Sequence, residues 1–341
     1  MWAGALDRLT RVVEAMAMQT VTLPNTHLAP SVLCLGGVPL GSMLDERRSF
    51  ALLDAFVAHG GTFLDTARVY ADWLPGERNA SEKTIGRWLQ RRGQRERLVI
   101  ATKGAHPELA AMHRPRLDRA SIVADLDQSL RNLQTDVIDL YWLHRDDPQT
   151  PVAAILDTLR DQVRVGKIRA YGCSNWRADR IAAAQAYARS QGWPGFAADQ
   201  MLWSLAAVAQ EALPDPTMIA MDAALFDLHV AGGLPAAPYA AQANGYFQRA
   251  AQGTLDAMNA ASRRLYDTPE NRRRSQAAQS LAAETGRSIS AVVLGYLLGQ
   301  PFPVLPIVGC RTVAQVEDSC RAARSPLCAA EIAWIEGRSA Q

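Results

Sequence analysis

Short apolar, β-rich segments alternate with amphipathic helical patterns along most of the chain, and this alternation restricts the fold more than any other feature. The predicted strands are Val32–Leu35, Thr62–Asp65, Leu98–Thr102, Val137–Leu143, Ile168–Cys173, Phe196–Gln200, Pro235–Tyr239 and Val304–Val308. The clearest predicted helices are Ser49–Ala58, Ser81–Arg91, Ser121–Leu133, Val152–Val165, Ala178–Arg189 and Ala314–Ala323. Alternating strands and helices are typical of a parallel sheet. Eight such units in a chain of 341 residues predict a (β/α)8 TIM barrel.

The stretch before the last predicted strand is longer than the other connections. Its segment Phe247–Gln300 predicts two additional helices, joined at the polar run Asp267–Arg274. Because no shift in composition marks a domain boundary, we expect residues 20–341 to form a single domain. Residues 1–19 then form an N-terminal extension whose pattern is compatible with a short amphipathic helix.

Charge and cysteine content exclude several classes of function. With 36 basic and 34 acidic residues, the net charge of +2 provides no field for binding nucleic acid or an anionic membrane. No segment approaches the roughly 18 unbroken apolar residues of a membrane span. The five cysteines include no CxxC pair, which favours reduced thiols and a cytoplasmic location. The six histidines are scattered, so we expect no metal site, and without an exposed dimer stripe we expect a monomer.

Ionisable residues follow three consecutive predicted strands. Asp65 and Tyr70 follow the second strand, Lys103 ends the third, and His144 follows the fourth. Lys103 is also one of only three lysines among the 36 basic residues, so most cationic positions carry arginine instead. Because the working residues of (β/α)8 barrels lie at the C-terminal ends of strands, we expect these four side chains to face one cavity.

The four side chains together suit the reduction of a carbonyl group, although each one alone is also compatible with a structural role. A phenol has an ordinary pKa near 10, and a nearby ammonium favours the phenolate and lowers that pKa. A carboxylate holds the ammonium and offsets its desolvation, while a histidine orients the carbonyl through a hydrogen bond. The set Asp65, Tyr70, Lys103 and His144 therefore predicts a general-acid site.

The run Gly60–Tyr70, followed by Lys103, His144 and the later Tyr171–Asn175, resembles the aldo-keto reductase family. The resemblance extends over about residues 20–325 and covers the order, the spacing and the strand-end placement of these motifs. It implies that Tyr70 is the proton donor, that Lys103 and Asp65 tune it, and that His144 orients the substrate carbonyl.

The resemblance also implies a nicotinamide cofactor extended over the mouth of the barrel. The chain has no GxGxxG motif after a strand, which argues against a dinucleotide-binding fold of the Rossmann type. Nearest the nicotinamide, the implied cofactor residues are Gly37, Val38, Ser174, Asn175, Gln200 and Trp203. Ser174, Asn175 and Gln200 match positions that hold the carboxamide. Trp203 stands where the family usually has a stacking tyrosine, and the alternative is a Trp buried in the core.

The phosphate groups of the cofactor are expected at two later segments. The loop after the seventh strand is the counterpart of the pyrophosphate loop, and it carries Tyr239, Ala240, Gln242 and Gly245. Ala240 replaces a frequent serine, so one hydroxyl is lost. The segment after the last strand resembles the adenosine-phosphate site and carries Gly309, Arg311, Gln315, Asp318 and Ser319. Because a guanidinium suits the oxygens of a 2′-phosphate, Arg311 favours NADPH over NADH.

Trp73 is expected to form one wall of the substrate cavity, in the loop after Tyr70. An aromatic ring among polar groups suits a small-molecule carbonyl substrate such as a keto-sugar, a keto-cyclitol or a bulky polar natural product. Two other functions remain open at this point. One is a Schiff-base lyase in which Lys103 is the nucleophile. The other is a non-catalytic, NADP(H)-binding regulatory protein of the same fold.

Overall fold

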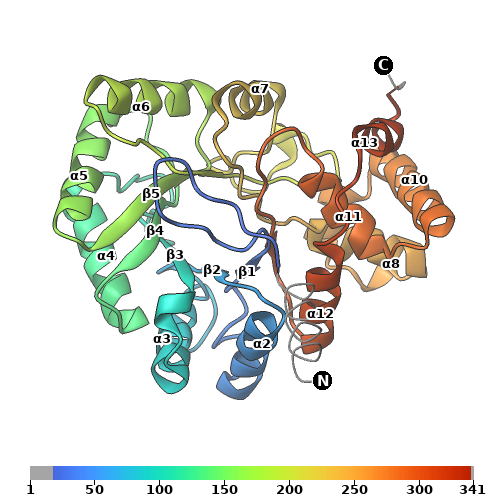
Figure 1. The fold of residues 1–341 in the computed structure, drawn as a ribbon, viewed down its shortest axis with the longest axis horizontal. Coiled ribbons are helices and arrows are strands. Elements are labelled where there is room, and N and C mark those ends of the chain that lie inside the picture. The colour runs from blue at the N-terminus through green and yellow to red at the C-terminus, as the bar shows by residue number, and fades with distance from the viewer. Residues whose placement is uncertain (1–17, 339–341) are drawn as a thin grey trace, which may run out of the picture.

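A computed structural model of the chain describes residues 18–338. The predicted N-terminal extension, residues 1–19, therefore lies almost entirely outside the described residues. Figure 1 shows a curved sheet with helices around its outer side and a further group of helices, α8, α10, α11 and α13, gathered at one flank. Within residues 18–338, no helix combines the length and the apolar character that a membrane span requires.

The strands form one parallel sheet in the order β6-β5-β4-β3-β2-β1-β7. Their bounds are β1 Cys34–Gly36, β2 Phe63–Asp65, β3 Val99–Gly104, β4 Ile138–Leu143, β5 Ile168–Ser174, β6 Asp199–Gln200 and β7 Ile307–Val308. From β2 to β6 each strand pairs in parallel with the strand before it, and β7 pairs in parallel with β1. This arrangement confirms the predicted (β/α)8 barrel.

The predicted seventh strand, 235–239, closes the ring between β6 and β7. Parallel bridges join Ala236 to Asp199 on one side and to Val304 on the other. The segment contains Pro235 and Pro238, and the segment leading to β7 contains Pro303 and Pro306. Each of these four prolines accepts a hydrogen bond at its carbonyl, from Asp199, Ile307, Ala236 and Cys34. Since proline has no N–H to donate, fewer backbone hydrogen bonds form between these segments, and the pairing there consists of isolated bridges and short strands.

The outer helices follow the strands in chain order. They are α2 Glu46–Ala58, α3 Ala80–Arg92, α4 Arg119–Leu133, α5 Val152–Arg164, α6 Ala178–Ser190, α7 Ala223–Gly232 and α12 Val313–Ala322. Neighbouring helices from α2 to α7 pack side by side, and α12 packs on α2, so the helical layer is continuous from α12 to α7. Side-chain oxygens cap several helix starts, for example Asp45 for α2, Asp118 for α4 and Thr312 for α12.

The expectation of two helices in the segment Phe247–Gln300 is wrong in number. Four helices fill the region, α8 Tyr246–Gln252, α9 Ala260–Tyr266, α10 Pro269–Thr285 and α11 Ile289–Leu298, and α13 Ala329–Glu336 follows later. Of the polar run 267–274, only Asp267 and Thr268 form the junction between α9 and α10, and the rest is the first part of α10, with Thr268 as its cap and Pro269 in its first turn. Gly253 and Gly286, both with positive φ, end α8 and α10.

Candidate active site

The four predicted catalytic side chains lie at adjacent strand ends. Backbone hydrogen bonds fix their relative heights: Arg68 N donates to the Lys103 carbonyl at 3.1 Å, and His144 N donates to the Gly104 carbonyl at 3.0 Å. The loop that carries Tyr70 is therefore tied to the end of β3, and the residue after β4 is tied to the same end. The parallel register thus brings together side chains that are up to 79 positions apart in the sequence, from Asp65 to His144.

Lys103 is the centre of the cluster, and its side chain is only 1% exposed. Its Nζ donates to the Tyr70 hydroxyl at 2.8 Å, to the Thr66 carbonyl at 2.9 Å, and to a carboxylate oxygen of Asp65. The other Asp65 oxygen accepts from Gln200 Nε2 at 3.2 Å. All three N–H groups of the ammonium are therefore used, and the ammonium is directed at the phenol oxygen by a buried ion pair.

The His144 ring meets the Tyr70 ring edge-on, with 5.9 Å between the two ring centroids. Its Nδ1 is buried, and no residue of the described chain forms a hydrogen bond with it. Burial, together with the charges of Arg145 and Lys103 and the neighbouring His106 ring, holds the pKa of His144 well below its ordinary value. With Nδ1 enclosed, Nε2 is the nitrogen of this neutral ring that could donate a hydrogen bond to a ligand oxygen.

Burial and the neighbouring charges act in opposite directions on the pKa values of the other three groups. It raises the pKa of Tyr70 above 10, and the Lys103 ammonium opposes this effect only in part. This direction differs from the lowering predicted from the ammonium alone, because that argument did not include desolvation. Burial lowers the pKa of Lys103, yet Asp65 and Tyr70 together raise it above its ordinary value. Tyr70 is thus a protonated phenol beside a protonated ammonium at neutral pH.

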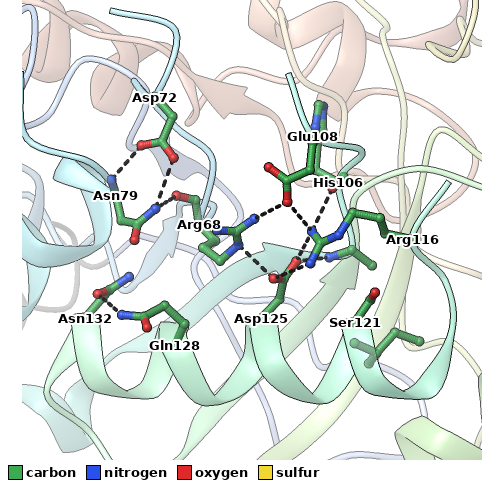
Figure 2. A network of polar contacts seen from close by, with 12 residues as sticks. Arg68, Asp72, Asn79, His106, Glu108, Arg116, Ser121, Asp125, Gln128 and Asn132 are labelled. Carbon is green, nitrogen blue, oxygen red and sulfur yellow. Dashed lines mark hydrogen bonds and ion pairs between the residues drawn. The ribbon is translucent and has the colours of Figure 1, made fainter. Parts of the chain in front are cut away.

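Trp73, predicted to form a wall of the substrate cavity, lies beside this cluster. Its ring is 48% exposed and meets the Tyr70 ring edge-on, with 6.3 Å between centroids. The loop is fixed by Asp72, which accepts from Asn79 N at 2.6 Å and from Asn79 Nδ2 at 3.2 Å (Figure 2). An exposed aromatic ring on a fixed loop beside the phenol can form a wall for a bound ligand.

Of the residues predicted to hold the carboxamide, Asn175 lies beside His144, and both of its side-chain polar atoms already form hydrogen bonds within the protein. Asn175 Nδ2 donates to the His144 carbonyl at 3.2 Å and to Ser174 Oγ at 3.0 Å. Asn175 Oδ1 accepts from Ile219 N at 3.0 Å and from the Tyr239 hydroxyl at 2.7 Å. Gln200 Nε2 donates to Asp65. A carboxamide at this place must therefore exchange with hydrogen bonds that exist in the structure.

Trp203 packs within an aromatic cluster. Its ring stacks on Phe302 at 5.9 Å and an angle of 28°, and it meets Phe226 and Tyr296 edge-on. It is 7% exposed. These contacts are those of a core tryptophan, which was the alternative to nicotinamide stacking.

The loop after residues 235–239 has an unusual backbone. Ala240, Ala243 and Asn244 all have positive φ, between 48° and 53°, and Gly245 has φ 79°. A turn with left-handed residues can direct N–H groups toward an anion, although Ala243 N and Gly245 N here already donate to the Ala240 and Gln242 carbonyls. Strain of this kind at residues other than glycine is concentrated at functional sites. The loop is compatible with a pyrophosphate even though Ala240 has no hydroxyl.

The segment after β7 contacts that loop directly. Gln242 Nε2 donates to Ser319 Oγ at 3.1 Å, so the two predicted phosphate-binding segments adjoin. Gly309 and Arg311 are exposed, and Gln315 Oε1 accepts from Arg311 N at 2.7 Å. Asp318 lies 3.9 Å from Arg321. Within residues 18–338, the Arg311 guanidinium forms no ion pair, which leaves it available for an anion.

Gly37 and Val38 follow β1, on the same side of the sheet as the catalytic cluster. Gly37 N donates to the Asp65 carbonyl at 2.7 Å, and an added Cβ on Gly37 would come within 2.7 Å of Ser81 Oγ. The glycine is therefore explained by close packing against the end of β2. Val38 is half-buried.

Two residues near the cluster did not stand out in the sequence. Arg145 donates to the His144 carbonyl at 2.9 Å, to Thr217 Oγ1 at 2.8 Å and to Asp215 at 3.1 Å. His106, three positions after Lys103, places its ring 4.6 Å from the His144 ring. In the sequence, its position shortly after Lys103, at the end of β3, is what could have indicated His106 as a site residue. In the described part of the chain, no group of His, Cys, Asp and Glu side chains forms a metal site.

Comparison with known proteins agrees with the arrangement of these residues. The model of the Aldo/keto reductase family matches residues 32–339. The chain is 32% identical over 315 residues to "Uncharacterized oxidoreductase YrpG" of Bacillus subtilis (strain 168), covering 89% of this chain and 91% of that protein. It is 31% identical over 332 residues to norsolorinic acid reductase stcV of Emericella nidulans, covering 93% and 80%.

Another relative is the aryl-alcohol dehydrogenase (NADP(+)) of Phanerodontia chrysosporium. It is 29% identical over 338 residues, with 92% of this chain and 82% of that protein covered. With the family match extending from β1 to the end of α13, the chain belongs to the aldo/keto reductase family of nicotinamide-dependent oxidoreductases, which act on small carbonyl compounds.

Proposed function

We propose that the protein reduces an aldehyde or a ketone to the alcohol with NADPH and that Tyr70 is the general acid. The observation that carries the proposal is the buried chain of contacts from Asp65 through the Lys103 ammonium to the Tyr70 hydroxyl. This chain provides a phenol that keeps its proton at neutral pH and a cation that stabilises the phenolate once the proton has left.

In the proposed reaction, the carbonyl oxygen of the substrate lies between the Tyr70 hydroxyl and the His144 ring. A bound reduced nicotinamide supplies the hydride that reaches the carbonyl carbon. Tyr70 transfers its proton to the oxygen, and the O–H bond of the phenol breaks as the O–H bond of the alcohol forms. The Lys103 ammonium, 2.8 Å away, then faces a phenolate. His144 orients the carbonyl by donating from its neutral ring.

The residues proposed to hold the cofactor fall into three groups. Ser174, Asn175 and Gln200 bind the carboxamide, and for Asn175 this requires exchange of its bonds to Ile219 and Tyr239. The strained backbone of Ala240–Gly245 binds the pyrophosphate. Arg311, whose guanidinium forms no ion pair within residues 18–338, binds the 2′-phosphate, which is the basis for NADPH rather than NADH. The dehydrogenase of Phanerodontia chrysosporium, whose name includes NADP(+), supports the same choice.

Two features support a polar substrate of the keto-sugar, keto-cyclitol or polar natural-product class. Trp73 presents an exposed aromatic face at the entrance, and aromatic faces pack on the C–H surfaces of hydroxylated rings. Arg145 and Asp215 add polar groups around His144. A Schiff-base reaction at Lys103 is disfavoured, because it requires a neutral amine and the pKa of Lys103 is raised by Asp65 and Tyr70 in spite of burial.

Substitution of Tyr70 by phenylalanine tests the proposal. We expect Tyr70→Phe to lower kcat for NADPH-dependent carbonyl reduction by about 100-fold or more, the scale of general-acid catalysis. The dissociation constant for NADPH, measured by fluorescence, should change less than about two-fold, because no proposed cofactor contact is lost. Tyr187→Phe is the matched control, since its hydroxyl bonds only to the surface residue Asp157. Retained kcat in Tyr70→Phe would refute the proposed acid.

A further inference from the structure

We propose that His106 accepts a hydrogen bond from a hydroxyl group next to the substrate carbonyl, so that the protein prefers α-hydroxy aldehydes and ketones. The proposal rests on the proposed carbonyl reduction and specifies its substrate class. His106 is not part of the catalytic cluster. It belongs to the loop after β3 and lies beside the ring of His144.

The hydrogen bonding of His106 determines which of its ring nitrogens is free. Nδ1 lies 2.7 Å from the Pro107 carbonyl, which can only accept, so Nδ1 carries the proton. Burial and the charge of Arg145 lower the pKa of His106 to about 4, so the ring is neutral near pH 7. Nε2 is therefore an acceptor, and no residue in the described range 18–338 donates to it.

The two neutral imidazoles have complementary roles. The His106 and His144 rings are 4.6 Å apart and inclined at 67°, and the His144 ring in turn faces Tyr70. In the proposed reaction, His144 donates to the carbonyl oxygen. A hydroxyl on the adjacent carbon then lies next to His106, where it meets an acceptor. Such a hydroxyl can donate to Nε2, whereas an ether oxygen at the same place cannot.

The backbone of His106 is held rigidly from both sides by the buried carboxylate of Asp125 in α4 (Figure 2). Asp125 accepts from Ala105 N at 2.9 Å, and it also accepts two hydrogen bonds, at 2.9 and 3.0 Å, from Arg116. Arg116 donates in addition to the His106 carbonyl at 3.0 Å. Ala105 has φ 59°, a strained conformation that this network maintains.

The same network also holds the loop that carries Tyr70. Arg68 Nε lies 3.0 Å from Asp125, and its guanidinium lies 3.9 Å from Glu108 in the His106 loop. One buried carboxylate thus fixes His106 and the Tyr70 loop relative to each other. A group that is held this firmly while its acceptor nitrogen stays unused is suited to recognise a ligand.

The test compares reduction of α-hydroxyacetophenone with that of α-methoxyacetophenone, and of hydroxyacetone with methoxyacetone. Each pair has an oxygen at the same position, so the inductive activation of the carbonyl is similar and only the donor O–H differs. We expect the wild-type protein to prefer the hydroxy compound in kcat/KM by about ten-fold, the value of one well-placed hydrogen bond. His106→Phe should reduce this preference to about two-fold or less.

Two further variants separate recognition from structural damage. His106→Gln places an acceptor oxygen near the position of Nε2 and should retain most of the preference. His113→Phe, at an exposed position in the same loop, should leave the preference unchanged. Equal kcat/KM values for the two members of each pair in the wild type, or an unchanged preference in His106→Phe, would overturn the proposal for His106 while leaving Tyr70-dependent reduction intact. If neither pair nor a wider carbonyl panel is reduced with NADPH, the proposed function itself fails.

Discussion

Substitution of Lys103 by methionine should reveal how strongly the buried ion pair contributes to folding. The change removes the ammonium and leaves the Asp65 carboxylate buried, with Gln200 Nε2 at 3.2 Å as its side-chain donor. In the wild type, burial already raises the pKa of Asp65 and Lys103 opposes that rise. Without Lys103, we expect Asp65 to take up a proton in the folded protein.

This protonation determines how much the free energy of unfolding falls in the variant. Taking up a proton at pH 7 on a group with an ordinary pKa of about 3.9 costs about 4 kcal/mol. This value agrees with the range of about 3–5 kcal/mol for breaking a buried pair. For a chain of 341 residues, 1 kcal/mol corresponds to about 1.5 °C in Tm, so Lys103→Met should lower Tm by about 6 °C.

The pH dependence gives the sharper test. In the variant, the folded-state pKa of Asp65 lies above the unfolded-state value, so folding is favoured at low pH and the penalty grows as pH rises. Between pH 7 and pH 5, the deficit in the free energy of unfolding should shrink by about 2.7 kcal/mol, or 1.36 kcal/mol per pH unit. Urea unfolding at both pH values, analysed against wild type, measures this change.

Lys167→Met is the matched control. Lys167 also bonds to a carboxylate, that of Asp127 at 2.6 Å, but both side chains are about one-third exposed, 34% and 35%. Because exposed pairs contribute at most about 1 kcal/mol, this variant should remain close to wild type at either pH. Equal destabilisation of the two variants, or a Lys103→Met deficit that does not change with pH, would refute the account of the buried pair.

Three further outcomes are expected. Because burial raises the pKa of Tyr70 above 10, kcat for reduction should stay level from pH 7 to pH 9 and fall only at higher pH, and a pH–rate profile that falls within that range would contradict the protonated phenol. Arg311→Met should raise KM for NADPH by about ten-fold or more while KM for NADH changes little, as steady-state kinetics with both cofactors will show. Trp203→Ala should lower the free energy of unfolding in urea by about 3–5 kcal/mol through loss of its ring contacts, whereas an unchanged midpoint would argue against a packing role.

Local patterns were sufficient to predict the barrel and to bring four side chains together. Apolar runs with an ionisable residue at the end place side chains such as Lys103 at the mouth, because parallel strands all end on the same side. The rarity of lysine also drew attention to this position. The structure shows that Lys83 and Lys167 form half-exposed pairs with Glu77 and Asp127, so they have surface partners.

Contacts between distant segments set the features that sequence reasoning did not predict. The environment of Trp203 depends on Phe226, Tyr296 and Phe302, which come from separate elements. The importance of Asp125 depends on three loop contacts that no periodicity encodes. The direction of the Tyr70 pKa depends on its degree of burial, which only the packed structure provides.

The prolines at the closing seam have a consequence for how the barrel opens. Hydrogen bonds there are fewer, since four positions in the two segments have no donor, and the weakest part of a closed ring separates first. The amide protons of the non-proline residues in 236–239 and 304–308 should therefore exchange before those of β3, β4 and β5. The loop 240–245 and α12 follow these two segments and meet through Gln242 and Ser319. An anion bound to both segments would hold them together at this weak part of the barrel. Binding of the anion would then stabilise the closed barrel over the opened one.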